Sequence, residues 1–281
     1  MKKGSFSTII LILVLVVGLS LMLYPSFSNY WNDLRQTKAI ANYDRVVADM
    51  SDEDCSHLFE DATRYNEALR NIRFPLMYYD EVPGYDNLLN IDGNGIMGYI
   101  QIEKIGVELP IYHGIDETVL QVAVGHIEGS SLPTGGESTH CALSAHRGLP
   151  SARLFTDLDK LEIGDVFTLT VVDRVLTYQV DQILVVEPEN IEPLYVKEGE
   201  DYCTLVTCTP YGVNSHRMLI RGTRIENEKQ LLDIRVTADA SIIDPIVVAP
   251  FVAAPILLVL FILLMLPKPR KNRRVDSCKK S

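Results

Sequence analysis

The stretch Thr204-Leu-Val-Thr-Cys208, followed by Thr-Pro-Tyr-Gly-Val-Asn-Ser-His-Arg217, decides the fold of this chain and the place of its chemistry. It reads as a strand that ends at a cysteine, a turn rich in proline, glycine and asparagine, and a second apolar strand. If Cys208 lies opposite Arg217 in an antiparallel pair, Val206 lies opposite Leu219, and all four side chains share one face. The sequence therefore predicts a guanidinium beside a thiol.

A thiol in that position can act as a nucleophile, because the thiolate is the reactive form of cysteine and a neighbouring cation favours it. The same cation can stabilise an oxyanion. His146 ends another apolar, strand-like run and is the best candidate to transfer protons. Each residue alone has a simpler explanation, because buried cysteines, hydrogen-bonded histidines and solvated arginines are common. Only the combination of Cys208, His146 and Arg217 predicts a catalytic site.

Together these residues resemble the sortases, cysteine transpeptidases of Gram-positive cell surfaces. Thr204 to Cys208 is similar to the family's Thr-Leu-x-Thr-Cys signature, and His146 and Arg217 fall at its histidine and arginine positions. The similarity extends over roughly residues 98–223. The resemblance implies these site residues: Cys208, His146 and Arg217 for catalysis, and Thr207 and Leu205 for substrate binding.

Further segments resemble class C, the pilus-assembling branch of the sortases. In chain order they are Gly95-Ile-Met-Gly-Tyr-Ile-Gln-Ile, Leu109-Pro-Ile-Tyr-His-Gly, Gly125-His126, Ser131-Leu-Pro-Thr-Gly-Gly, His146-Arg-Gly-Leu-Pro and Leu154-Phe-Thr-Asp-Leu. The resemblance implies a membrane-anchored enzyme with an eight-stranded sortase barrel. It also implies pilin partners that carry a Leu-Pro-x-Thr-Gly-like sorting signal and an acceptor lysine.

Class C members commonly carry a lid before the barrel, with an Asp-Pro-aromatic motif that plugs the active site. Residues 71–90 have the right position and a loop-like composition, but Asp80 is followed by glutamate, and the aromatic residue of Phe74-Pro75 precedes its proline. We therefore expect this segment to close the pocket only weakly. Its candidate contacts with the pocket are Tyr78, Tyr79 and Asp80.

Two apolar runs flank the central part of the chain. Residues 7–24 contain no charge and follow two lysines, and as a helix they would be about 27 Å long, enough to cross a bilayer. A cleaved signal peptide is the alternative explanation. Residues 246–266 form the second run, which ends in a cluster of lysines and arginines. The positive-inside rule then predicts that both termini are cytoplasmic and that the catalytic residues lie outside the cell membrane.

The net charge limits the classes of partner, and the cysteine content limits the possible disulfides and metal sites. Residues 28–244 hold 17 of the 26 basic residues and 36 of the 37 acidic ones, a net charge of −19, which argues against nucleic acid and favours basic or polar protein substrates. Five cysteines are too few for a disulfide framework, although a Cys141–Cys203 bridge stays open. No Cys-x-x-Cys or His-Glu-x-x-His pattern occurs, so we expect no metal and no cofactor.

The rest of the pattern predicts a mainly β domain behind a helical segment. Residues 29–70 read as two amphipathic helices, the second capped by Ser51 with Asp54. The strand candidates are 99–102, 107–111, 140–145, 166–171, 176–186, 202–208 and 218–224, which favours a closed barrel. The sequence predicts the following segments in chain order: a cytoplasmic tail (1–6), an anchor (7–24), a helical stalk (25–70), a lid-like loop (71–90), the catalytic barrel (91–226), a linker (227–245), a second transmembrane helix (246–266) and a basic cytoplasmic tail (267–281).

The function implied by the resemblance is cleavage of the sorting signal between Thr and Gly through a thioacyl-enzyme, followed by transfer to a pilin lysine. The nearest alternative is a sortase that attaches surface proteins to the peptidoglycan precursor. A non-catalytic surface domain held by two anchors is the alternative from a different class.

Overall fold

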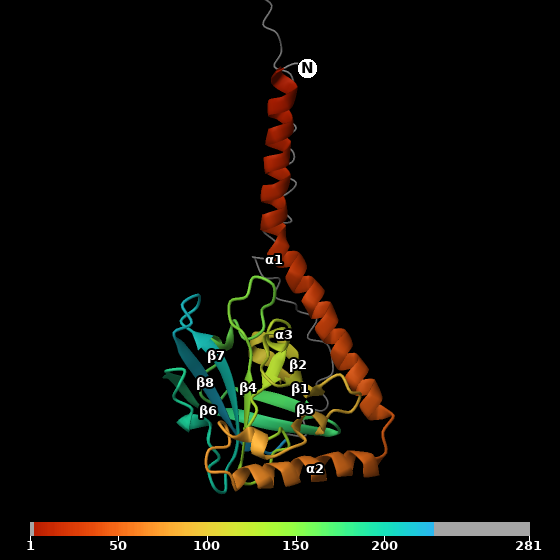
Figure 1. Ribbon diagram of the computed structural model, residues 1–281, viewed down its shortest axis with the longest axis vertical. Coiled ribbons are helices and arrows are strands. Elements are labelled where there is room, and N and C mark those ends of the chain that lie inside the picture. Colours follow the sequence, from red (N-terminus) through yellow and green to blue (C-terminus); the bar gives the residue numbers. More distant parts are fainter. Residues whose placement is uncertain (1–2, 228–281) are drawn as a thin grey trace, which may run out of the picture. The chain divides into compact units, whose positions relative to one another are not determined.

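The computed structural model describes residues 3–227, which fall into two units, 3–26 and 27–227 (Figure 1). The helices are α1 (Lys3–Ala48), α2 (Asp52–Arg70) and α3 (Glu117–Leu120). The strands are β1 (Ile96–Ile102), β2 (Val107–His113), β3 (Val124–His126), β4 (Thr139–Ser144), β5 (Val166–Val171), β6 (Arg174–Val186), β7 (Asp201–Thr209) and β8 (His216–Ile225).

The eight strands close into a barrel in the order β1-β2-β3-β4-β7-β8-β6-β5. Two neighbouring pairs, β2 with β3 and β4 with β7, are parallel, and the other pairs are antiparallel. The predicted closed barrel is confirmed, and seven of its strands match the strand candidates. The sequence pattern missed β3, because three residues are too few to show an alternation.

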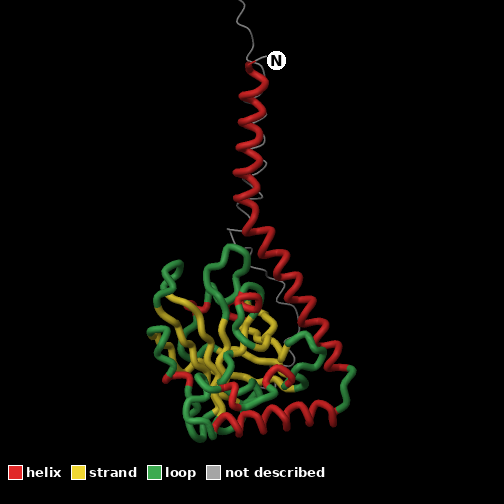
Figure 2. Tube along the Cα trace, in the orientation of Figure 1, coloured by secondary structure: helices red, strands yellow, loops and turns green. Residues whose placement is uncertain are grey.

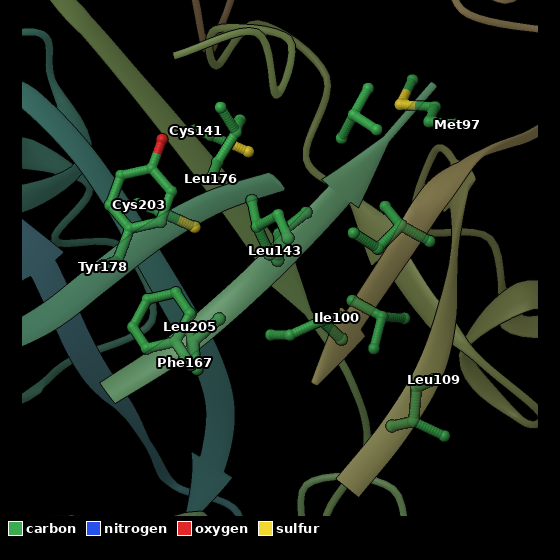
Figure 3. Packing of buried hydrophobic residues seen from close by; sticks show 14 of the residues in the cluster. Met97, Ile100, Leu109, Cys141, Leu143, Phe167, Leu176, Tyr178, Cys203 and Leu205 are labelled. Atoms are coloured by element: carbon green, nitrogen blue, oxygen red, sulfur yellow. The ribbon is translucent and has the colours of Figure 1, made fainter. Parts of the chain in front are cut away.

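The barrel interior is filled by the inward-facing residues of the strands (Figure 3). Along β5 every second side chain is buried, the alternation typical of a strand with one face on a core. Phe167 of β5 stacks on Tyr178 of β6 with ring centroids 5.6 Å apart. Gly222 of β8 lies against these rings, and a Cβ there would be 2.7 Å from Phe167. Only glycine fits, so the stacked pair fixes where β8 crosses the core.

The helix α2 packs across one end of the barrel (Figure 1). It begins with the predicted capping box, in which the Ser51 hydroxyl accepts from the backbone N–H of Asp54 and the Asp54 carboxylate accepts from the backbone N–H of Ser51. The inner face of α2 is formed by buried residues at helical spacing, which are Cys55, Phe59, Ala62, Tyr65 and Leu69. The cap therefore sets the start of a helix whose apolar face completes the core.

Within residues 27–48, α1 docks on the barrel through Tyr43. The Tyr43 hydroxyl donates to the Met97 carbonyl at 2.8 Å and accepts from the Val172 backbone N–H at 2.7 Å. Burial raises the pKa of this phenol well above its usual range. Because Met97 lies in β1 and Val172 in the β5–β6 turn, one side chain holds the helix to two strands.

The first part of α1 is apolar enough to cross a membrane by length and composition, from Ile10 onward. This helix overlaps the anchor predicted at 7–24, and a signal sequence near the N-terminus would pass the same test. The second apolar run, 246–266, and the basic tail lie outside the described residues, so the prediction of two transmembrane helices rests on the sequence alone.

A buried histidine ties β4 to the strand that ends at Cys208. His140 Nδ1 faces the Tyr195 carbonyl at 3.0 Å, and Nε2 faces the Thr204 hydroxyl at 2.7 Å. A neutral ring can make both hydrogen bonds, because Nδ1–H donates to the carbonyl and Nε2 accepts from the hydroxyl. Burial lowers the pKa of His140 from 6.5 to about 4, because the charged ring would lose its hydration.

We expect His140 to make the barrel sensitive to acid. The His140 ring takes up a proton near pH 6.5 in the unfolded chain but only near pH 4 in the folded state. The contribution of the neutral ring to stability is therefore complete above pH 6.5 and is lost as the pH falls from 6.5 towards 4. Between pH 7 and pH 5 the free energy of unfolding should drop by about 2 kcal/mol through His140 alone. Urea unfolding of wild type and His140→Gln at both pH values measures this. His57→Gln, on an exposed α2 histidine, should keep the wild-type pH dependence; an unchanged dependence in His140→Gln would contradict the account.

Candidate active site

The β7–β8 hairpin has the predicted register. Cys208 pairs with Arg217, Val206 with Leu219, and Thr204 with Arg221. Cys208 is partly exposed, whereas Leu205 and Cys203 on the alternate face are fully buried in the barrel core. The thiol therefore lies at the end of β7, on the outer face of the barrel, directly opposite the arginine.

His146 reaches the same edge because β4 and β7 run parallel and end together. Their register continues to Ser144 opposite Val206. One residue later the Ala145 backbone N–H donates to the Val206 carbonyl at 3.2 Å, and the Thr207 hydroxyl donates to the Ala145 carbonyl at 2.9 Å. His146 thus follows β4 at the level of Thr207 and Cys208. Residues 62 positions apart in the sequence meet at one corner of the barrel.

The segment after His146 is fixed by its own contacts. The Phe155 backbone N–H donates to the His146 carbonyl at 3.1 Å, and the Gly148 backbone N–H donates to the Thr156 hydroxyl at 3.1 Å. Arg147, almost buried, pairs with Asp159 at 2.6 Å. The Leu154-Phe-Thr-Asp-Leu motif therefore has a clear role, which is to hold the backbone on which His146 stands.

The His146 ring faces a carboxylate that the sequence pattern did not reveal. His146 Nε2 lies 3.4 Å from Glu117 Oε2, and the Gln121 amide donates to Glu117 Oε1 at 3.2 Å. Hydrogen bonds from Gln121 and then from His146 lower the pKa of Glu117. Glu117 begins the four-residue helix α3, 29 positions before His146. No motif joins these two positions, so only the fold could show the pair.

The Arg217 guanidinium folds back over the β7–β8 turn. Its Nη1 donates to the carbonyls of Asn214 and His216 at 3.2 and 3.1 Å. Within residues 3–227 no carboxylate pairs with Arg217, and no hydrogen bond joins it to the Cys208 thiol. These two bonds orient the guanidinium and leave its other N–H groups able to bind an oxyanion.

Leu205 and Thr207, predicted to bind substrate, point away from the site. Leu205 is fully buried in the core, and the Thr207 hydroxyl is taken up by the Ala145 carbonyl. Because side chains alternate along a strand, the residue next to the cysteine in sequence lies on the opposite face. The Cys208 face instead presents Val206 and Leu219.

Next to Cys208 and Arg217 on this face, Val206 and Leu219 belong to a packed apolar cluster. The cluster is formed by residues of four strands, one 3₁₀ turn and one loop: Ala142, Val206, Leu219, Leu184, Val186, Leu194 and Ile127. Leu76, from the segment predicted to be a lid, packs against this cluster. Gly129 makes the approach possible, because a Cβ there would lie 2.4 Å from the Pro75 carbonyl oxygen. Leu76 therefore covers part of the apolar cluster next to the thiol.

Of the predicted lid contacts, Tyr78 and Asp80 are exposed, and Tyr79 lies beside Glu128, whose charge raises the pKa of the Tyr79 phenol. The residue of this segment that packs against the apolar cluster is Leu76. A short aliphatic side chain without a flanking motif gave the sequence analysis nothing to recognise.

Between α2 and β1 the chain runs mostly as loop (Figure 2), and two buried side chains tie the second half of segment 71–90 to the core. Leu89 is fully buried, and the Tyr85 hydroxyl lies 2.9 Å from His126 Nδ1 and accepts from the Gly114 backbone N–H at 3.0 Å. The Leu88 carbonyl lies 2.8 Å from His113 Nε2. The two histidines thus hold the end of the segment. Because Tyr85, Leu88 and Leu89 are tied to the core in this way, 71–90 is not one separable lid.

Comparisons with known proteins identify the family that has this arrangement of strands and residues. Residues 100–225 match the sortase domain model. A structure of sortase C1 from Streptococcus agalactiae is 48% identical, covers 68% of this chain and 100% of its own, and superposes with a TM-score of 0.63. The chain belongs to the sortase family. Its class C branch is shown by the same structure and by sortase C of Streptococcus pneumoniae, at 44% identity, 68% and 97% coverage and a TM-score of 0.61.

The match to curated sortases varies in length, and sortase A of Bacillus anthracis is 25% identical over 224 residues, which is 79% of this chain and 96% of that relative. Sortase A of Streptococcus agalactiae serotype III (strain NEM316) is 32% identical over 117 residues, which is 41% of this chain and 47% of the relative. The aligned part of this chain therefore covers about half the length of that relative. Residues 100–225, which match the sortase domain model, contain the barrel strands that carry the cysteine, histidine and arginine. Among the described residues no group of three His, Cys, Asp or Glu side chains forms a metal site.

We expect Glu117→Gln to lower the kcat of this sortase roughly tenfold, because a misoriented imidazole forfeits part of the proton-transfer contribution. KM should stay near wild type, since Glu117 is not part of the apolar cluster next to Cys208. Asp116→Asn removes the adjacent carboxylate, which has no hydrogen bond to His146 among the described residues, and should keep wild-type turnover. Steady-state kinetics on a sorting-signal peptide measures both. Equal loss in the two variants would show a general charge effect instead.

Proposed function

We propose that this chain is a membrane-anchored class C sortase that joins pilin subunits. Cys208 is the nucleophile, His146 the acid and base, and Arg217 the oxyanion donor. The observation that carries the proposal is the common edge of β4, β7 and β8, where the ends of these strands bring the three residues together beside an apolar cluster. The pilin substrates of the Streptococcus pneumoniae relative support the choice of substrate.

In the first half-reaction the Cys208 thiolate attacks the threonine carbonyl carbon of a Leu-Pro-x-Thr-Gly-like signal. The Arg217 guanidinium stabilises the oxyanion that forms, and a C–S bond replaces the Thr–Gly peptide bond. His146 donates a proton to the departing glycine amine. The product is a thioacyl-enzyme with the pilin attached to Cys208.

In the second half-reaction a lysine amine of the next pilin attacks the thioester. His146 accepts a proton from this amine, the C–S bond breaks, and an isopeptide bond forms as the Cys208 thiolate is released. Glu117 keeps the imidazole in place through both proton transfers. The acidic exterior, −19 over residues 28–244, favours the approach of a basic acceptor segment.

The apolar cluster next to Cys208 suits the apolar part of the signal. Val206 and Leu219 belong to it on the thiol side, and Leu76 packs against it from the lid segment. A signal that binds along the strands has to displace Leu76. Because Leu76 is not accompanied by an Asp-Pro-aromatic plug, we expect this displacement to be easy. The apolar contact of the substrate then replaces the apolar contact of the lid.

The acceptor separates pilus assembly from its nearest alternative, attachment to the peptidoglycan precursor. We expect the full chain, given a sorting-signal peptide with equal amounts of a pilin lysine peptide and a peptidoglycan-stem amine, to form mainly the lysine isopeptide. Mass spectrometry of the products identifies the bond. Cys208→Ala should form neither product, whereas Cys55→Ala, a change at a buried thiol of α2, should form both as wild type does. Preference for the stem amine would move the function to cell-wall attachment.

Arg217→Lys tests the oxyanion role. A lysine ammonium is a point charge and cannot reproduce a guanidinium that is fixed by two turn carbonyls while it binds the oxyanion. We expect turnover to fall at least about tenfold. Arg221→Lys, the same change four residues along β8 at an arginine paired with Asp181, should stay within about twofold. Wild-type turnover in Arg217→Lys would remove the oxyanion role.

A further inference from the structure

Two cysteines that the proposed mechanism does not use face each other inside the barrel. The parallel register of β4 and β7 pairs Cys141 with Cys203, and their side chains are 3% and 0% exposed in the same core cluster (Figure 3). Neighbouring strands lie about 4.7–4.9 Å apart, within the range of about 4.4–6.8 Å between Cα atoms that a disulfide requires. Both thiols are free in this structure.

The environment of the pair is asymmetric. Burial acts to raise the pKa of both thiols, but the neighbouring Cys203 thiol and the His126 ring lower the pKa of Cys141, whereas burial raises the pKa of Cys203. One readily ionised thiol beside a protonated one is the arrangement that thiol–disulfide exchange uses.

We propose that Cys141 and Cys203 are a redox pair that closes to a disulfide between β4 and β7. The Cys141 thiolate attacks a disulfide oxidant, either oxidised glutathione or a protein disulfide, and releases one thiol. Cys203 then attacks the Cys141 sulfur of the mixed disulfide and releases the second thiol. The pair loses two electrons and two protons, and the oxidant becomes two thiols. The biological setting rests on the proposed extracytoplasmic site, where disulfides persist.

The bond would join the two strands that place the catalytic residues. β4 leads to His146 and β7 to Cys208, so a cross-link near their middle would hold the corner where the active site forms. The enclosed loop of about 60 residues predicts substantial stabilisation by restriction of the unfolded chain. Cys208 cannot substitute for Cys203, because it lies five residues further on the outer face of the same strand. Since the pair is buried, exchange requires folding or transient opening of the barrel.

The test uses the full chain in detergent with Cys208→Ala, because no lysine or arginine separates Cys203 from Cys208 and trypsin leaves both in peptide 198–217. The protein is unfolded in urea, refolded with oxidised and reduced glutathione, quenched with acid, alkylated and digested. We expect peptide 105–147 linked to peptide 198–217 through Cys141 and Cys203. The linked protein should melt at least about 5 °C above its reduced form.

Two further variants in the same background make the result specific. Adding Cys203→Ser should abolish the link, and adding Cys55→Ser should preserve it. The proposal is overturned if Cys141 and Cys203 stay alkylatable, if each carries glutathione without joining, or if the linked form melts below the reduced form. None of these readouts depends on transpeptidation, so the proposed function can fail while the redox pair stands, and the reverse.

Discussion

The parallel pairing of β4 with β7 is the constraint on which the active site depends. It brings the end of one strand, and therefore His146, to the level of Thr207 and Cys208 on another strand 62 residues later. The hairpin from β7 to β8 then sets Arg217 opposite the thiol. His140 and Thr204 hold the same two strands together below the site. A shift of β4 by one residue would turn its side chains to the other face and separate the three groups.

Local sequence was sufficient for the parts of the site that lie within one hairpin. The register of Cys208 with Arg217 follows from the turn residues and the apolar alternation, and the structure has that register. The Ser51 and Asp54 cap was equally local. The closed barrel could be inferred from strand number and spacing together with the family motifs. The role of His146, by contrast, came from its resemblance to the sortases, because β4–β7 pairing is a long-range contact.

The parts that the sequence did not reveal all depend on tertiary structure. Glu117 meets His146 from a helix of four residues, and no spacing rule connects them. Leu76 packs against the apolar cluster as an ordinary aliphatic residue, so the search for an aromatic plug passed over it. Tyr85 anchors the supposed lid to His126, which ties half of that segment to the core. Leu205, which the resemblance implies for substrate binding, lies in the core because strand alternation turns it away from the Cys208 face.

The central claim is that the thiol at the β4–β7–β8 corner forms the covalent intermediate. Its most direct test is the intact mass of the full chain, quenched with acid during turnover of a Leu-Pro-x-Thr-Gly peptide without an acceptor amine. The account predicts one added acyl group ending at threonine, located on Cys208 by peptide mapping and released by hydroxylamine. Turnover without such an adduct, or an adduct on another cysteine, would contradict it.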